Sequence, residues 1–266
     1  MKNILRIILT RLGVFARRIP QLKDMWCDLD AINRLIQVNI STAILHQQTF
    51  PRFKGIYAGR DIAVIATGPT LSRYKPIENC ITIGVNHAFL NPELELDYLF
   101  AYDYTAIKGV IKEMNEYRRG KCIKFYGFCT EYKDSINRVI PESEAIKANA
   151  LRFRTDWAPV DYFHSRFYVD LSVMPVAAYH SSVFAAMQFA LWTNPRRIYI
   201  VGCDCSADGH FTDVKRKEID PPDAPIRLID GWKALKFFAN RYYPDTEIVS
   251  VNPVGLKGVF TDIYQK

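Results

Sequence analysis

The 266-residue sequence lacks any run of about 18 apolar residues, the length that a helix needs to span a bilayer. It also lacks a CxxC pair, since its six cysteines stand at positions 27, 80, 122, 129, 203 and 205. We therefore expect reduced thiols in a cytoplasmic protein rather than a disulfide framework or a zinc ribbon. Neither a GxGxxG fingerprint nor a P-loop occurs, so these two phosphate-binding motifs are excluded.

The chain carries more positive than negative charge, with a formal net charge of +7, and 49% of its residues are hydrophobic. That hydrophobic content suffices for one sizeable core, or for one core and a small subdomain. A basic balance favours acidic partners such as nucleotide phosphates, anionic lipid or nucleic acid. A solvated basic surface with no such partner fits equally well. The motifs below favour a sugar nucleotide, and no nucleic acid partner is expected.

Residues 1–50 are predicted to form an N-terminal helical extension. In its first 20 residues, apolar and basic side chains separate onto two sides of a helix. The apolar side holds Leu5, Ile8, Leu12, Phe15 and Ile19, and the basic side holds Lys2, Arg6, Thr10 and Arg17. Arg6 and Arg11 interrupt the apolar stretch, so we expect no secretory signal. Residues 1–20 then either contact the inner membrane surface or pack on the domain or on a second subunit of a homo-oligomer.

Short apolar runs alternate with helical patterns from residue 51 to residue 260, which predicts one nucleotide-binding α/β domain. The predicted strands are 61–67, 81–85, 97–102, 122–127, 196–202 and 247–251, and the predicted helices are 105–118, 181–193 and 229–242. This alternation indicates a Rossmann-like, doubly wound, mainly parallel sheet. The irregular stretch 128–180 is expected to form a lid insertion, and 206–228 a long polar loop.

Small or polar groups follow four of these strands. They are Thr67-Gly68-Pro69-Thr70, Asn86-His87, Asp103-Tyr104 and Cys203-Asp204. Because ligands of open α/β sheets bind beyond the carboxyl ends of the strands, we expect these groups to converge on one site.

Each group also has an ordinary structural explanation. Gly68 is expected to let the backbone approach a phosphate or ribose, and Thr70 to cap a helix whose free N–H groups favour an anion, yet Gly-Pro-Thr is also a common turn. Asn86 and Asp103 are candidates for holding a base or ribose, or are turn residues. Ser181 and Ser182 open an apolar helix, where one of them is expected to be its N-cap and both to hold a phosphate or a sugar carboxylate.

Two histidines are candidates for a general base, because imidazole exchanges protons near neutral pH. His210 lies in the polar loop after Cys203-Asp204, and His180 directly precedes the serine pair. The alternative for His210 is a surface histidine. A zinc site from Cys203, Cys205, Asp208 and His210 is the weaker alternative, since its spacing is not diagnostic, and we expect no metal.

Five segments resemble, in order, the bacterial lipo-oligosaccharide sialyltransferases and related Kdo transferases of the lipopolysaccharide core. They are IAVIATGPTL, ITIGVNHAF, YLFAYDYT, HSSVFAAMQFALWTNPRRIYIVGCDC and GWKALKFFANRYYPDTEIVSVNP, within residues 55–255. The same pattern occurs in motility accessory glycosyltransferases and in an archaeal pterin pyrophosphokinase. The resemblance therefore implies a nucleotide-binding fold more firmly than it implies a particular donor.

By this resemblance, the cytidine nucleotide would be held by residues of the first three strand ends, and its sugar carboxylate or phosphate by the serine pair. The sequence also departs from the family pattern. The stretch Asp223 to Asp230 has no histidine where the sialyltransferases place a catalytic one, and Tyr179 stands where they have an arginine. We expect His210 to substitute for the missing base.

The sequence thus predicts a glycosyltransferase that moves an acidic sugar from a CMP-sugar to a glycan or lipid-linked acceptor, without a metal or other cofactor. Two alternatives remain open. One is a Mg²⁺-dependent, pyrophosphokinase-like phosphotransferase with Asp103 and Asp204 as carboxylate ligands. The other is a non-catalytic nucleotide-binding module.

Overall fold

The computed structural model describes residues 20–129, 138–156, 166–179, 181–206, 208–212 and 224–265. Its strands are β1 (Asp61–Ile65), β2 (Cys80–Val85), β3 (Tyr98–Ala101), β4 (Ile123–Phe128), β5 (Leu151–Arg154), β6 (Arg197–Val201), β7 (Glu247–Val251) and β8 (Thr261–Ile263). Its α-helices are α2 (Pro20–Thr49), α3 (Tyr104–Ile107), α4 (Ile111–Glu116), α6 (Glu142–Ala148), α7 (Ser182–Trp192) and α8 (Ala224–Tyr242). Short 3₁₀ turns are η1 (Pro51–Phe53), η2 (Pro69–Arg73) and η3 (Asn86–Leu90).

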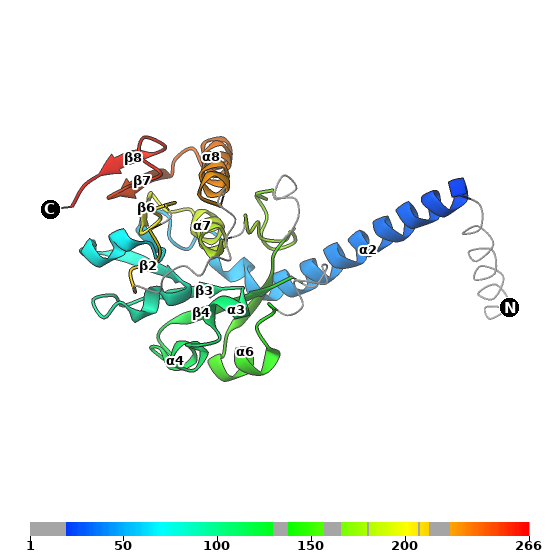
Figure 1. Cartoon of the computed structure of the whole chain (residues 1–266), viewed down its shortest axis with the longest axis horizontal. Coiled ribbons are helices and arrows are strands. Elements are labelled where there is room, and N and C mark those ends of the chain that lie inside the picture. The colour runs from blue at the N-terminus through cyan, green and yellow to red at the C-terminus, as the bar shows by residue number, and fades with distance from the viewer. Residues whose placement is uncertain are drawn as a thin grey trace.

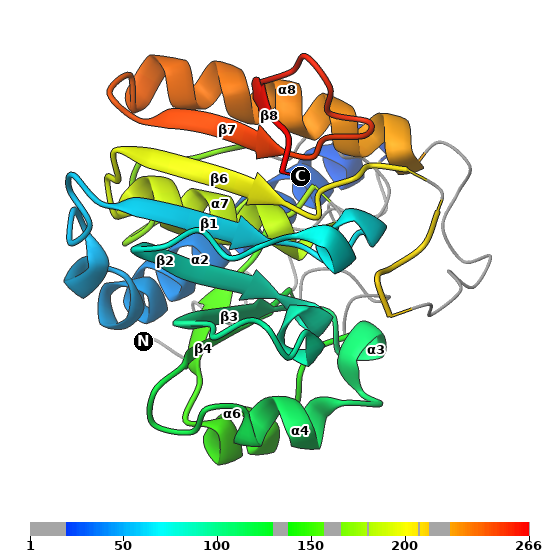
Figure 2. The same ribbon diagram turned by 90° about the vertical axis from the view of Figure 1, so that its left-hand side faces the viewer.

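The strands of the described residues form one parallel sheet in the order β5-β4-β3-β2-β1-β6-β7-β8. The chain builds outward from β1 to β5 in one direction and then from β6 to β8 in the other, as Figure 2 shows. The predicted doubly wound, Rossmann-like α/β fold is confirmed. The direction reverses between β1 and β6, which makes the crevice at their carboxyl ends the place where such sheets bind ligands.

Apolar side chains cover both faces of the sheet, as a parallel sheet requires. On one face, α7 packs over alternate residues of β1, β2 and β3, including Val64, Val85 and Phe100, while α8 joins the same apolar cluster and α2 contacts β5. On the other face, η2, η3, α4 and α6 cover residues such as Ile65, Leu99 and Tyr126.

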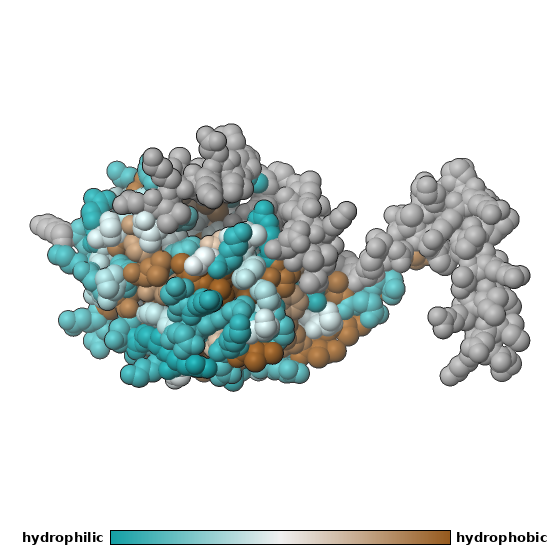
Figure 3. All heavy atoms as spheres, turned by 60° about the horizontal axis from the view of Figure 1, so that its bottom comes forward, coloured by the Kyte–Doolittle hydropathy of each residue, from teal (hydrophilic) through white to brown (hydrophobic). Residues whose placement is uncertain are grey.

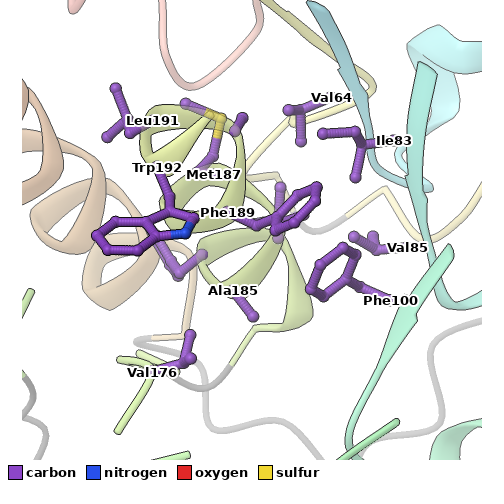
Figure 4. Close-up of a cluster of buried hydrophobic side chains, with 14 of the residues drawn as sticks. Val64, Ile83, Val85, Phe100, Val176, Ala185, Met187, Phe189, Leu191 and Trp192 are labelled. Atoms are coloured by element: carbon purple, nitrogen blue, oxygen red, sulfur yellow. The ribbon is translucent and has the colours of Figure 1, made fainter. Parts of the chain in front are cut away.

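Helix α7 forms the centre of the first layer. All eleven of its residues are buried, which explains why its sequence is apolar around the whole circumference. The ring of Phe189 points toward Ile83, Val85 and Phe100 of the sheet (Figure 4). This packing fixes the N-terminus of α7 at the carboxyl edge of β1 and β2.

Two strands, one helix break and one helix start differ from the sequence prediction. Helix α8 begins at Ala224, inside the predicted loop 206–228. The strands β5 and β8 were not predicted, because LRFR and TDI are too short and too polar to show a buried-strand pattern. The predicted helix 105–118 is divided into α3 and α4, with the break at residues 108–110. Within the predicted lid insertion, α6 packs on α4 and β5 joins the main sheet. The domain boundaries and the lid stay a prediction.

Helix α2 joins the body through a buried histidine near its C-terminal end. The His46 Nδ1 lies 2.9 Å from the carbonyl oxygen of Leu171, and its Nε2 accepts the Arg154 N–H at 2.8 Å. A carbonyl only accepts and an N–H only donates, so the ring is neutral with its proton on Nδ1. Burial lowers the pKa of His46 from 6.5 to about 4.

We predict that this histidine makes the fold sensitive to acid. Its folded pKa lies below its unfolded value, so its contribution is complete above pH 6.5 and is lost as the pH falls toward about 4. The free energy of unfolding from urea titrations should drop by about 2 kcal/mol between about pH 7 and about pH 5. His46→Gln, which keeps a neutral donor and acceptor, should flatten that part of the curve. An unchanged slope in the variant would contradict the assignment.

Candidate functional site

The loops after β1 and β6 are bonded to each other at the point where the sheet reverses direction. The Ala66 N–H donates to the Val201 carbonyl at 2.8 Å, and the Gly68 N–H donates to the Gly202 carbonyl at 2.8 Å. Parallel pairing thus continues past the ends of the two strands. The Gly-Pro-Thr loop is held against the Gly-Cys-Asp loop, as the convergence of strand ends predicted.

The Asp204 side chain holds the loop after β1 against the loop after β6. Its carboxylate accepts the Thr70 N–H at 2.8 Å and the Thr70 hydroxyl at 2.5 Å, and the residue is only 5% exposed. Both carboxylate oxygens are therefore used to hold the first turn of η2. These hydrogen bonds show that Asp204 shapes the loop, and since Asp204 also lines the pocket, its role in donor binding stays a prediction.

Gly68 is required here for a reason that differs from the predicted one. A Cβ at this position would lie 2.5 Å from Asp204 Oδ2 and 2.6 Å from the Gly202 carbonyl oxygen. Its φ of −66° is accessible to any residue, so close packing rather than backbone freedom demands glycine. The small residue lets the β1 loop touch the β6 loop.

A pocket opens above the two loops. Its lining comes from the β1 loop, the β6 loop, the segment that carries His210, and the helices α7 and α8. The lining residues are Ala66, Thr67, Gly68, Ser181, Val183, Gly202, Cys203, Asp204, Cys205, Ser206, Gly209, His210, Leu228 and Trp232. The cavity volume is about 110 Å³. Sites that enclose whole drug-sized ligands start at about 300 Å³, so this cavity matches one end of a nucleotide, such as a phosphate or a sugar.

His210 is anchored to the β1 loop. Its Nδ1 lies 2.8 Å from the Thr67 hydroxyl and 3.3 Å from the Thr67 carbonyl oxygen, and the Phe211 N–H donates to the same carbonyl at 3.0 Å. A proton on Nδ1 satisfies both oxygens of Thr67, which leaves the lone pair of the ring on Nε2. The histidine that the sequence offered as a base thus lines the pocket.

His87, the residue after Asn86, lies close enough to His210 for their charges to interact. Burial, and secondly the charge of His210, lower the pKa of His87. The neutral form of His87 is therefore favoured. Two imidazoles from different loops share this part of the sheet edge.

The serine pair and Asn86 meet at the start of α7. Ser181 is the N-cap, and its hydroxyl accepts the Val183 N–H at 3.5 Å. The hydroxyl of the buried Ser182 donates to the Asn86 side-chain carbonyl at 3.2 Å. Of these three residues only Ser181 lines the pocket, so Ser182 and Asn86 act by linking α7 to the end of β2.

Asp103 and Tyr104 lie at the same edge of the sheet but outside this pocket. The Asp103 carboxylate accepts the Thr105 N–H at 2.9 Å and pairs with Arg138 at 3.0 Å. It is the N-cap of α3. Tyr104 lines a different hollow, beside Lys108 and Lys147. Asp103 therefore has the contacts of a turn residue, which was the structural alternative to a role in binding a base or ribose.

The zinc alternative finds no support in the described residues, where no three His, Cys, Asp or Glu side chains gather as metal ligands would. Burial raises the pKa of the Cys203 thiol well above its ordinary value, so the sulfur stays protonated. His180 lies outside the described residues. Pro69 and Thr70 form the start of η2 rather than the pocket wall.

Of the described non-glycine residues with a left-handed backbone, one lines the pocket and two lie beside residues of the site. Cys205 lines the pocket with a φ of 46°, while Asn86 and Tyr179, near the start of α7, have φ values of 48° and 40°. Asparagine tolerates this conformation, whereas tyrosine and cysteine are strained by roughly 1–3 kcal/mol each. Such strain is characteristic of functional sites and marks this edge of the sheet.

Sequence reasoning missed the contribution of α8. Trp232 and Leu228 line the pocket from that helix, and Trp232 also belongs to the buried apolar cluster. Cys205 and Ser206 were also missed as pocket residues. Their position directly after a predicted strand end was the available signal.

Comparison with known proteins identified no matching family model and no matching curated protein. Among solved structures, the chain is similar to the MAf glycosyltransferase from Magnetospirillum magneticum AMB-1, with 14% identity and a TM-score of 0.44 over 84% of this chain. The chain spans only 38% of that protein's length.

The chain is also similar to the sialyltransferase CstII from Campylobacter jejuni, solved with the substrate analogue CMP-3FNeuAc. Identity is 14% and the TM-score 0.39, with 72% of this chain and 80% of that chain covered. A further structure, of the sialyltransferase CST-II with a trisaccharide acceptor and CMP, gives a TM-score of 0.40. The fold assignment of this chain rests on its own sheet topology.

We predict that Gly68→Ala destabilises the fold together with the site. The added methyl group would overlap the Asp204 carboxylate and the Gly202 carbonyl, and overpacking of this kind typically costs about 1–3 kcal/mol. The matched control is Gly109→Ala, where nothing lies within 4 Å of the new Cβ. Thermal or urea unfolding should separate the two variants. Equal stability of both would show that the β1 and β6 loops are not in contact.

Proposed function

We propose that this protein is a glycosyltransferase that moves an acidic sugar, of the Kdo or sialic acid type, from a CMP-sugar to a glycan hydroxyl. The observation that carries the proposal is the pocket at the reversal point of the sheet, which combines a helix N-terminus with a fixed histidine. The choice of CMP-sugar follows from the ordered sequence motifs. A lipopolysaccharide or another lipid-linked glycan is the acceptor class that goes with this donor.

The N-terminus of α7 suits the phosphate of such a donor. The first N–H groups of any α-helix have no partner within the helix, and the helix dipole favours an anion there. Ser181 places this helix end at the pocket wall, and its hydroxyl accepts the Val183 N–H at 3.5 Å, a long hydrogen bond that a phosphate oxygen would replace. Among the described lining residues, His210 is the one that can carry a positive charge, so backbone N–H groups would supply much of the phosphate binding.

His210 is suited to the proton transfer that glycosyl transfer requires. The acceptor oxygen forms a bond to the anomeric carbon, and the bond from that carbon to the CMP phosphate breaks, with its electron pair leaving on CMP. The acceptor hydroxyl proton moves to Nε2 of His210. Thr67 supports this role because it keeps the other ring nitrogen protonated and the ring oriented.

The contacts of the two aspartates favour glycosyl transfer over the phosphotransferase alternative. Asp204 accepts two hydrogen bonds from Thr70, while Asp103 caps α3 and pairs with Arg138. They follow β6 and β3, strands that are separated in the sheet by β1 and β2. Carboxylates that share a Mg²⁺ ion lie together and offer it their oxygens. We therefore propose a metal-independent reaction.

The acceptor and the place of action follow from the same proposal. A lipid-linked acceptor would bring the enzyme to the cytoplasmic face of the inner membrane. In the described part of the chain, no helix combines the length and the apolar character needed to cross a bilayer. The first 19 residues, which carry the predicted basic and apolar sides, lie outside the described residues.

His210→Ala should lower the release of CMP from a CMP-linked acidic sugar, in the presence of glycan acceptor and EDTA, by about 10²–10⁴-fold. The reason is the loss of the group that takes the acceptor proton. The affinity for CMP, measured by calorimetry, should change little, because α7 and the β1 loop remain. The rate of the wild-type enzyme should fall at acid pH as His210 becomes protonated, and the variant should lack this limb.

The matched control is Thr67→Val, which removes the hydroxyl beside Nδ1 but leaves the Thr67 carbonyl in place. It should reduce the rate less than His210→Ala does. Near-wild-type turnover and an intact acidic limb in His210→Ala would contradict the role of this histidine. If neither the wild type nor the variants bind CMP, the proposed donor is wrong.

A further inference from the structure

Helix α2 carries a row of exposed apolar side chains. Leu29, Ile36, Ile40 and Ile44 are 53%, 49%, 49% and 61% exposed, and Asn33 is exposed between the first two. Their spacing of seven, four and four residues places them on one side of the helix. We call these four residues the α2 stripe. Figure 3 shows apolar side chains, in brown, on the part of α2 that leaves the body.

The body of the protein cannot cover this stripe. Thr42, His46 and Thr49, which are buried against the body, lie on nearly the opposite side of the helix. Thr49 and His46 bond to Arg152, Arg154 and Leu171 there. Away from this contact the helix projects from the body, as Figure 1 shows. At 1.5 Å per residue, its 30 residues extend about 45 Å.

The residues around the stripe fit another protein helix better than a lipid surface. Residues 35–49 contain no Lys, Arg, Asp or Glu, and the exposed positions beside the stripe include Gln37, Gln47 and Gln48. Over its whole length α2 has three aspartates against one lysine and one arginine. Helices that lie on anionic membranes carry Lys and Arg on the face beside the apolar one. The uncharged glutamines beside the α2 stripe instead allow a second protein helix to pack against the stripe.

We propose that the α2 stripe is the interface of an antiparallel homodimer. When two copies run in opposite directions about a centre between Ile36 and Gln37, Leu29 of each copy lies opposite Ile44 of the other. Asn33 then lies opposite Ile40. The same patch thus serves both copies, and a two-fold interface of this kind closes at two subunits.

The antiparallel direction follows from space. Because the body joins α2 near its C-terminal end, an antiparallel pair puts the two bodies at opposite ends of the paired helices. The dimer forms through α2 alone and leaves the pocket of each copy outside the interface.

The test compares Ile40→Glu with Ser41→Glu in the full-length protein. Both add one charge to an exposed position of the same helix, but only the first lies on the stripe. Sedimentation equilibrium should show a dimer for the wild type and for Ser41→Glu. Ile40→Glu should raise the dimer dissociation constant by about tenfold or more, because the charge would be buried without a partner. The far-ultraviolet circular dichroism spectrum should still show a folded body, since Ile40 is exposed in the monomer.

The direction of pairing is tested with Leu29→Cys and Ile44→Cys, oxidised and then mapped by mass spectrometry of the linked peptides. The double variant should form the 29–44 bond between copies, and neither single variant should link position 29 to 29 or 44 to 44. Links between identical positions would overturn the antiparallel arrangement. A wild type that stays monomeric at every concentration, or an Ile40→Glu variant that loses only binding to anionic vesicles, would overturn the dimer.

Discussion

The two hydrogen bonds from Thr70 to the buried Asp204 carboxylate determine the shape of the candidate site. They join the loop after β1 to the loop after β6 at the point where the sheet changes direction. Gly68 permits this contact because any side chain there would collide with Asp204. Thr67 belongs to the same loop, and its hydroxyl holds the His210 ring. The position of His210 therefore depends on the contact between Thr70 and Asp204.

Helix α7 supplies the second constraint. It is buried on all sides, so its N-terminus cannot move without disturbing both the sheet and α8. The hydrogen bond from Ser182 to Asn86 ties this end of the helix to β2. An anion bound at α7 would therefore find N–H groups that are already in place, which is the arrangement that stabilises developing charge at least cost in reorganisation.

Much of the fold could be predicted from the sequence, because its central strands are short, apolar runs between polar turns. All six predicted strands exist, and the four that precede the predicted polar groups are β1, β2, β3 and β6. The short strands β5 and β8 could not be predicted, since their pairing rather than their composition makes them strands. In the site, the sequence placed Thr67, Ser181 and His210 together. It could not show that the carboxylates of Asp103 and Asp204 bond to Arg138 and Thr70, because these partners lie 35 and 134 residues away along the chain. The bond from Thr105 to Asp103 is local and fits the predicted turn residue.

The central claim is that a cytidine nucleotide binds without metal between β1, β6 and α7. Hydrogen–deuterium exchange with and without CMP, in EDTA, tests it most directly. Peptides that cover residues 66–70, 181–184 and 202–206 should exchange more slowly when CMP is present, and ATP with Mg²⁺ should not reproduce the effect. Protection by ATP with Mg²⁺ alone, or protection confined to the hollow beside Tyr104, Lys108 and Lys147, would contradict the claim.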